Sequence, residues 1–494
     1  MRRVALAGTV LAAALVGAVP LPGLSPAGRA ALAVATFAAG CWITGALPLP
    51  VTATLVPPLA AVTGAQPTLA AAFAPMADPV VFLLFAGFVI AAALDHHDVD
   101  RRVAFRVVRA LGTSPRRLLL AVMVTTAGLS MLLSNSATTA MMVPVAASVA
   151  GATDGVVGAE PTTDATEAAN FERVLLLGTA YAASIGGVGT LVGTPPNAIV
   201  VAALADVGIG ISFAEWLAIG LPVVVVGLPL AWLLLLRLFP VGDVDVSGAR
   251  RAATAGLDAA GELDRDARVT VAVTAATAVL WVVGGLGFLV EGALAPGVYA
   301  AVFGPTGVLN YVVVGLLGVA ALFVFGAVGW EEVSGIDWGT LLLLGGGIAL
   351  ADALDGSGAV TYLATGAVEA AGDVPIAVVV LGLVVGVVAL SELASNTATA
   401  AVLAPILIGV GPRYADALGT TGTGAAVFLA VTGAVAASFG FALPVATPPN
   451  AIAFGTGRIE RDDMLRAGLA LDAVMALVAA GSLFLLFRFG LSFG

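Results

Sequence analysis

The sequence predicts an all-α protein that spans the membrane many times and is built from two related halves. Its mean hydropathy is +1.08 and only 10% of its residues are charged, values far from those of soluble globular domains. Apolar runs such as VVFLLFAGFVIAAAL and LPVVVVGLPLAWLLLLRLF approach or exceed the length that crosses a bilayer. The 61 glycines suit closely packed membrane helices, in which small residues let backbones approach.

The apolar segments come in an order that occurs twice along the chain. We expect about 11 spans plus two re-entrant hairpins. Residues 1–98 and 269–351 hold the segments that open each half, and a hydrophilic linker at 241–268 separates the halves. Within 99–240 the expected elements are a hairpin at 114–151, a broken helix at 172–206 and a following helix at 212–239. Within 352–494 they are a hairpin at 374–410, a broken helix at 424–456 and a last helix at 464–491.

Arginines concentrate in three loops, around 101–117, 245–268 and 458–466. By the positive-inside rule all three loops are cytoplasmic, and we expect a cytoplasmic N-terminus in the plasma membrane. The two halves then start from opposite faces of the bilayer, which is the arrangement of an inverted repeat. The start, MRRVALAGTVLAAALVGAVPLPGLSPA, has the pattern of a signal peptide. In a protein with many spans we expect it to be the first membrane helix, and its cleavage stays open.

The hexapeptide TPPNAI occurs at 194–199 and again at 447–452, both times within apolar sequence. Proline in a helix interior removes a hydrogen bond and clashes with the preceding turn. At the first helical position it is favoured, and threonine is a good N-cap before it. We therefore expect a fresh helix start at Thr194 and at Thr447, within segments that are already crossing the membrane. Such breaks are tolerated only where protein or a water-filled cavity covers the backbone.

A second motif pairs LLSNSATTAMMVP at 132–144 with LASNTATAAVLAP at 393–405. Each copy lies between two half-length apolar stretches, which predicts the tip of a re-entrant hairpin. In both halves the Ser-Asn-Ser/Thr motif precedes the Thr-Pro-Pro-Asn motif by 50 to 60 residues. Short, interrupted segments at matching places of two halves indicate the binding site of a transporter.

The four breaks would gather up to four helix N-termini, each with free N–H groups and about half a positive charge. The nearest arginine before the first motif is Arg117, 17 positions upstream of Ser134. An anion at this point would meet helix ends, hydroxyls, asparagine amides and bound metal cations instead of a basic side chain. Freed carbonyls and Ser or Asn oxygens are hard ligands that suit Na⁺. These motifs predict a sodium-coupled anion site.

The segments SNSATTAMMVP, SNTATAAVLAP, GTPPNAI and ATPPNAI resemble the divalent anion/sodium symporters, the family of sodium-dicarboxylate, citrate and sulfate carriers. The resemblance covers nearly the whole chain. It implies a homodimer in which 1–98 and 269–351 form a scaffold, while 99–240 and 352–494 move as an elevator. The first motif is Ser-Asn-Ser where the family commonly has Ser-Asn-Thr, so Ser136 lacks a methyl group. A dicarboxylate such as succinate is the first choice of substrate and sulfate the second.

The resemblance also implies two groups of site residues. The residues that would hold Na⁺ are Ser130, Ser134, Asn135 and Gly193 at a first site, and Ser391, Ala394, Asn396 and Ala446 at a second. The residues that would meet the substrate are Ser134, Asn135, Ser136, Thr194, Pro195, Ser395, Asn396, Thr397, Thr447 and Pro448. Beyond Na⁺, the small anion, membrane lipid and a second subunit, no organic cofactor and no nucleic acid is expected.

Several alternatives stay open from the sequence alone. Glu392 could couple protons as an intramembrane acid, although we favour pairing with backbone N–H groups at a hairpin tip. The run DHHDVD at 95–100 indicates a solvated helix end in preference to a metal site, and GGGIAL at 345–350 indicates close helix packing. An ion channel and a sodium-independent anion or metalloid exporter are the rival functions. An enzyme is not expected, because the chain has no HExxH motif and no catalytic His placed with a nucleophile.

Overall fold

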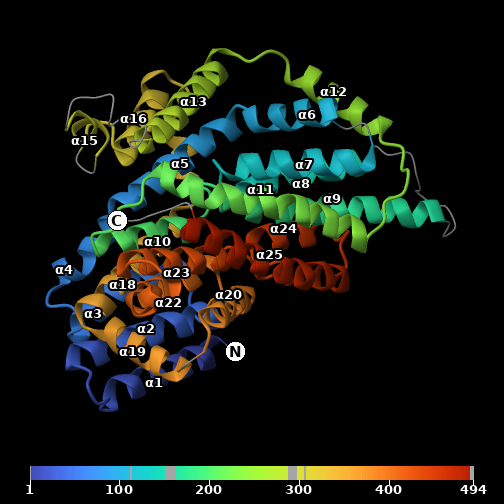
Figure 1. Cartoon of the computed structure of the whole chain (residues 1–494). Helices are drawn as coiled ribbons and strands as arrows, with labels where there is room; N and C mark the ends of the chain where they lie inside the picture. Colours follow the sequence, from blue (N-terminus) through green and yellow to red (C-terminus); the bar gives the residue numbers. More distant parts are fainter. Residues whose placement is uncertain are drawn as a thin grey trace.

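The computed structural model describes residues 2–111, 114–151, 163–286, 297–304, 307–372 and 374–489. All regular secondary structure in these ranges is helical (Figure 1). Eight of the described helical segments are long and apolar enough to cross a membrane by length and composition. The chain is therefore an all-α polytopic membrane protein, as the composition predicts. Residues 490 and 491 of the last expected helix, and 287–296 and 305–306 of the range 269–351, lie outside the described residues.

The helices that open the two halves pack together. In the first half they are α1 (Arg2–Ala18), α2 (Pro26–Thr44), α3 (Leu49–Thr63), α4 (Leu69–Phe73), η1 (Ala74–Ala77) and α5 (Pro79–His96). In the second half they are α13 (Arg265–Gly285), α15 (Val298–Phe303), α16 (Tyr311–Val324), α17 (Trp330–Ser334) and α18 (Trp338–Gly356). Helix α19 (Ala359–Ala371) follows them, within the range 352–494. Helix α18 packs against α3, and α16 packs against α5.

Close packing of α18 depends on the three glycines of the GGGIAL run. A Cβ atom on Gly346 would lie 2.4 Å from the carbonyl oxygen of Ala53 on α3, and one on Gly347 would lie 2.8 Å from the Cβ atom of Ala401. All three glycines are buried. The predicted role in helix packing is confirmed.

Each half continues with a hairpin and a broken helix. In the first half these are α7 (Pro115–Ser130) and α8 (Asn135–Gly151), then α9 (Thr163–Gly187) and α10 (Pro195–Asp206), followed by α11 (Phe213–Leu238). In the second half they are α20 (Ile376–Leu393) and α21 (Asn396–Val410), then η2 (Gly411–Tyr414), α22 (Ala415–Leu418), α23 (Gly422–Ala437) and α24 (Pro448–Gly455), followed by α25 (Arg461–Phe489). Figure 1 shows α7, α8, α9 and α11 side by side, in agreement with their contacts.

The short helix after each break packs against the opposite half. Helix α10 contacts α21 and α23 of the second half, and α24 contacts α8 and α9 of the first. The next long helix of each half, α11 or α25, also approaches the break closely through a glycine. A Cβ atom on Gly220 of α11 would lie 2.3 Å from the carbonyl oxygen of Val188, and one on Gly468 of α25 would lie 2.2 Å from that of Phe441. The two breaks are thus enclosed by protein on equivalent sides.

The hydrophilic linker at 241–268 contains a helix, α12 (Ser247–Ala260), which packs against α6 (Val99–Leu111) (Figure 1). Helix α6 is amphipathic, with Val99, Ala104 and Val108 buried on one face. The Arg102 guanidinium donates to the carbonyl oxygens of Ala260 and Gly261, at 2.7 and 2.6 Å. A cation at the C-terminus of a helix satisfies carbonyls that lack an intrahelical partner.

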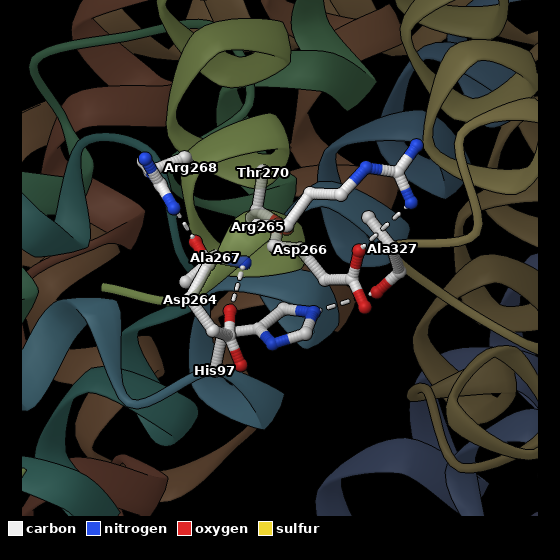
Figure 2. A network of polar contacts seen from close by, with 8 residues as sticks. All are labelled: His97, Asp264, Arg265, Asp266, Ala267, Arg268, Thr270 and Ala327. Carbon is white, nitrogen blue, oxygen red and sulfur yellow. Dashed lines mark hydrogen bonds and ion pairs between the residues drawn. The ribbon is translucent and has the colours of Figure 1, made fainter. Parts of the chain in front are cut away.

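The two histidines of the DHHDVD run contact the second half of the chain. His96 lies 3.5 Å from Glu332, and His97 Nε2 lies 2.7 Å from the carbonyl oxygen of Ala327. Figure 2 shows His97 beside the start of α13, where Asp264 accepts a hydrogen bond from the N–H of Ala267. That hydrogen bond lowers the pKa of the Asp264 carboxyl, and the nearby His97 adds to the effect. The run therefore joins α5 to the second half; it is more than a solvated helix end.

We expect Gly346→Ala to lower the melting temperature of the protein in detergent by several degrees, because overpacking a helix contact costs about 1–3 kcal/mol. Gly382→Ala on α20 is the matched control, since no atom lies within 4 Å of the added methyl group. Alanine is the better helix former, so the control should melt at or slightly above the wild-type temperature. Equal melting temperatures for the two variants would contradict the role of Gly346 in packing.

Candidate functional site

The tips of the two hairpins have the same hydrogen-bonding geometry. Ser130, buried at the end of α7, lies 2.7 Å from Asn135 Oδ1 and 2.8 Å from the carbonyl oxygen of Ala183. Its counterpart in the second half is Ser391. It is also buried, and it lies 2.7 Å from Asn396 Oδ1 and 2.6 Å from the carbonyl oxygen of Ala437. In each half a buried serine therefore joins the hairpin tip to the end of the helix before the break.

The asparagines of the two TPPNAI motifs hold the carbonyls that each helix break releases. Asn197 Nδ2 donates to the carbonyl oxygens of Gly187 and Thr190, at 3.0 and 2.8 Å. Asn450 Nδ2 donates to those of Gly440 and Leu443, both at 3.0 Å.

Both asparagines are fully buried, where an unpaired carbonyl would be costly. No role for these two residues was predicted from the sequence, although they stand inside the repeated motif. They fix the shape of the two unwound segments.

The expected helix starts are confirmed, and the four N-terminal residues divide into two kinds. Thr447 Oγ1 accepts from the N–H of Asn450 at 3.3 Å, and Ser134 Oγ accepts from the N–H of Ala137 at 3.2 Å. Thr194 and Ser395 stand at the N-cap positions of α10 and α21 without a side-chain capping bond. In each half, one hydroxyl caps a helix and another is not used for capping.

One cavity of about 920 Å³ brings the two halves together. The motif residues that line it include Ser134, Asn135, Ser136, Thr194, Pro195, Ser395, Asn396, Thr397, Thr447 and Pro448. These are all ten residues expected to meet the substrate. None of the described residues that line the cavity is basic, and Asp337 is the one acid among them.

The cavity lining outside the motifs and breaks is mainly apolar and comes from the helices that open the two halves. Trp42 and Ile43 of α2, Phe88 of α5 and Leu343 of α18 line this side. These residues could not be singled out from the sequence, because apolar residues on membrane helices look alike whether they face lipid, a neighbour or a cavity. We call the lining from the two hairpin tips and the two breaks the floor of the cavity, and the lining from α2, α5 and α18 its wall. The floor is polar and the wall is mainly apolar.

The first expected sodium site is a cluster of oxygen atoms. Asn135 Oδ1 lies 2.7 Å from Ser130 Oγ, 3.1 Å from the carbonyl oxygen of Ala183 and 3.3 Å from that of Gly193. With the amide turned over, its nitrogen would donate to the same three oxygens. The cluster therefore requires one positive partner, either an N–H group or a cation. Neutral oxygens of this kind suit a hard cation such as Na⁺.

Three of the four residues expected at this site thus contribute oxygens to one cluster. The fourth, Ser134, caps α8 beside it. Gly193 also packs tightly, since a Cβ atom there would lie 2.5 Å from the carbonyl oxygen of Gly187 and 2.9 Å from that of Ser130. Only glycine fits this position without a shift of the backbone.

The second expected sodium site repeats part of this pattern. Ser391 and Asn396 are 2.7 Å apart, and Ala394 has an extended backbone in the turn between α20 and α21. A Cβ atom on Gly440 would lie 3.5 Å from the Cβ atom of Ala446 and 3.7 Å from the carbonyl oxygen of Ser391. The four expected residues therefore gather at the second hairpin tip and the second break.

Glu392 pairs with backbone N–H groups, which is the arrangement that we favoured. Its two carboxylate oxygens accept hydrogen bonds from Ala442 and Leu443, at 2.7 and 2.9 Å.

Comparison with known proteins shows the family of the chain. The family model for the sodium:sulfate symporter transmembrane region matches residues 2–487. An uncharacterized transporter of Haemophilus influenzae is 33% identical over 458 residues, with 92% of this chain and 91% of that protein covered. A sodium-dependent dicarboxylate transporter SdcS of Staphylococcus saprophyticus is 31% identical, with coverage of 92% and 85%. Another SdcS, from Staphylococcus aureus strain USA300, is 30% identical, with coverage of 90% and 84%.

Two solved structures share the fold at low sequence identity. The YdaH transporter of Alcanivorax borkumensis has a TM-score of 0.53 at 15% identity, with 85% of this chain and 87% of that chain covered. MtrF of Neisseria gonorrhoeae has a TM-score of 0.56 at 13% identity, with coverage of 98% and 94%. The family model spans nearly the whole sequence, and relatives above 30% identity cover more than nine tenths of it. The chain belongs to the sodium:sulfate symporter family and is a multi-pass membrane transport protein, not an enzyme.

Proposed function

We propose that the protein is a secondary transporter that couples Na⁺ to the symport of a divalent anion, with a C4-dicarboxylate such as succinate as substrate. The observation that carries this proposal is the cavity itself. Its floor consists of two hairpin tips rich in neutral oxygens, and none of the described residues that line it is basic. A divalent anion would therefore need bound cations to balance its charge. Two named relatives are sodium-dependent dicarboxylate transporters.

The proposed sequence of binding follows from charge. Na⁺ binds first, at Ser130, Ser134, Asn135 and Gly193 and at Ser391, Ala394, Asn396 and Ala446. The bound cations and the N-termini of α8, α10, α21 and α24 then create a positive field at the cavity floor. The two carboxylates of the anion meet hydroxyl and amide groups, including the Thr194 and Ser395 hydroxyls that cap no helix. The apolar wall at Trp42 and Phe88 faces the carbon chain of the anion.

The proposal includes an elevator mechanism in the plasma membrane, with a cytoplasmic N-terminus. Residues 1–98 and 269–351 would form the scaffold of a homodimer, and 99–240 and 352–494 would move. Helices α6 and α12, which pack against each other, lie where the chain passes between these parts. The cavity supports this division, because its floor comes from the parts expected to move and its wall from the expected scaffold.

Sulfate is the second candidate substrate, because the family model is described for sodium:sulfate symporters. Ser136 replaces the threonine that is common in the family, so the pocket would be slightly larger or more polar at this position, and both anions remain candidates. A sodium-independent exporter or an ion channel would lack the coupling proposed here.

Transport into proteoliposomes tests the function directly. With an inward Na⁺ gradient we expect saturable uptake of labelled succinate, which falls to background when K⁺ replaces Na⁺, because the anion site needs bound cations. The sodium dependence should be steeper than first order, since two sites must fill. Sodium-dependent sulfate uptake without succinate uptake would change the substrate and keep the coupling. Uptake of neither anion under either cation would contradict the symporter.

Removing either hairpin asparagine should abolish coupled uptake. We expect Asn135→Ala and Asn396→Ala each to lower uptake about tenfold or more, since even outer partners of a bound metal change its affinity roughly 10- to 100-fold. Asn170→Ala is the matched control, because Asn170 is half-buried, bonds to the carbonyl oxygen of Pro240 and to Arg173, and is not among the residues that line the cavity. Normal uptake by both hairpin variants, at wild-type expression and melting temperature, would place the site elsewhere.

A further inference from the structure

The unwound segment before α24 is held by two acidic side chains. Three consecutive backbone N–H groups, those of Phe441, Ala442 and Leu443, point at carboxylates. Asp472 Oδ1 of α25 accepts from Phe441 at 3.2 Å, while the Glu392 oxygens accept from Ala442 and Leu443 at 2.7 and 2.9 Å. Hydrogen bonds to charged acceptors are stronger than those between neutral groups. This segment is therefore fixed by charge-assisted bonds from two different helices.

The first half makes the equivalent connections without any charge. Leu443 corresponds to Thr190, 253 residues earlier. Glu392 directly follows Ser391, and the residue that directly follows the equivalent Ser130 is Met131. In the first half the Thr190 hydroxyl donates to the carbonyl oxygen of Met131. Both halves thus connect the same position of the hairpin tip to the same position of the break. In the first half a hydroxyl donates to a backbone carbonyl. In the second half a backbone N–H donates to a carboxylate.

The remaining two amides show the same contrast. Phe441 and Ala442 correspond to Val188 and Gly189, whose N–H groups bond to the carbonyls of Ile185 and Gly186 in their own turn. Gly220 and Gly468 occupy equivalent places against the two breaks, and four residues later the first half has Val224 where the second has Asp472. Neither acid of the second half has an acidic counterpart in the first.

The two carboxyls are buried together without a basic partner. Glu392 and Asp472 are each 8% exposed, and Asp472 Oδ2 is buried without a hydrogen-bond partner. No ion pair in the described part of the chain includes either residue. Burying acids without a cation is costly. A cation bound nearby would offset that cost, and Glu392 lies between Ser391 and Ala394 of the expected second sodium site.

We propose that Glu392 and Asp472 are positioning residues for the second sodium site, so that this site depends on negative charge that the first site lacks. Their carboxylates hold Phe441–Leu443, and this segment leads directly to Ala446 and Thr447. They also add negative charge beside the bound cation in a region of low dielectric. This inference rests on the proposed sodium symport and adds to it that the two cation sites are unequal in chemistry.

The test uses two backgrounds, each with one site removed. Asn135→Ala leaves the second site and Asn396→Ala leaves the first. In each background the melting temperature of the purified protein is measured against Na⁺ concentration, with choline replacing Na⁺ at constant ionic strength. Ligand binding to the folded state raises the melting temperature, so the half-saturating Na⁺ concentration is read without transport.

We expect Glu392→Gln and Asp472→Asn to raise that concentration roughly tenfold in the Asn135→Ala background, the size typical of groups that orient metal ligands. In the Asn396→Ala background the same substitutions should change the half-saturating Na⁺ concentration less than about twofold, because the first site is coordinated by separate residues. Thr190→Val is the matched control for the first half and should give the opposite pattern. A purely structural role would instead lower the melting temperature in choline and affect both backgrounds alike.

Equal effects in the two backgrounds, or no effect in either, would overturn the inference while leaving sodium symport intact. So would an Asn135→Ala background whose melting temperature does not respond to Na⁺. A wild-type protein whose melting temperature ignores Na⁺ would refute the proposed function and this inference with it. Should Glu392→Gln fail to fold, Asp472→Asn decides alone, because its remaining amide oxygen can still accept from the N–H of Phe441.

Discussion

The structure depends on the satisfaction of backbone polar groups at two places where a membrane helix stops and starts again. A bilayer offers no water to these groups, so each must find a partner within the protein. Asn197 and Asn450 meet this requirement by donating to carbonyls from the unwound turns. With the carbonyls held on one side, the helix N-termini are free to face the cavity on the other. The motif that breaks the helix therefore also supplies the group that makes the break tolerable.

The crossed packing of the short helices joins the two halves into one site. Helix α10 leaves its own half to lie on α21 and α23, and α24 does the reverse with α8 and α9. The cavity consequently takes its floor from both hairpins and both breaks. Aromatic packing supports the arrangement, since Tyr181 of α9 lies edge-on against Phe441 in the unwound segment of the other half, with ring centroids 5.2 Å apart.

Much of this arrangement could be predicted because the repeated motifs carry it. The helix starts at Thr194 and Thr447 follow from proline chemistry, and the ten motif residues that line the cavity share one pattern of spacing. The joint hold of Glu392 and Asp472 on Phe441–Leu443 could not be predicted, because Asp472 lies in a long apolar helix and has no acidic counterpart in the first half. The helix within the 241–268 linker was also missed, since its polar composition concealed a face that packs on α6. Contacts between different elements produce no repeating pattern in the sequence from which they could be predicted.

The exchange of α10 and α24 between the halves has a consequence for how the protein is made. The first half enters the membrane long before residues 396–455 exist, so during that interval α10 lacks its partners α21 and α23, and α8 and α9 lack their neighbour α24. Contacts between residues so far apart in sequence form late, because their loops must close first. The cavity is therefore among the last features to assemble during synthesis.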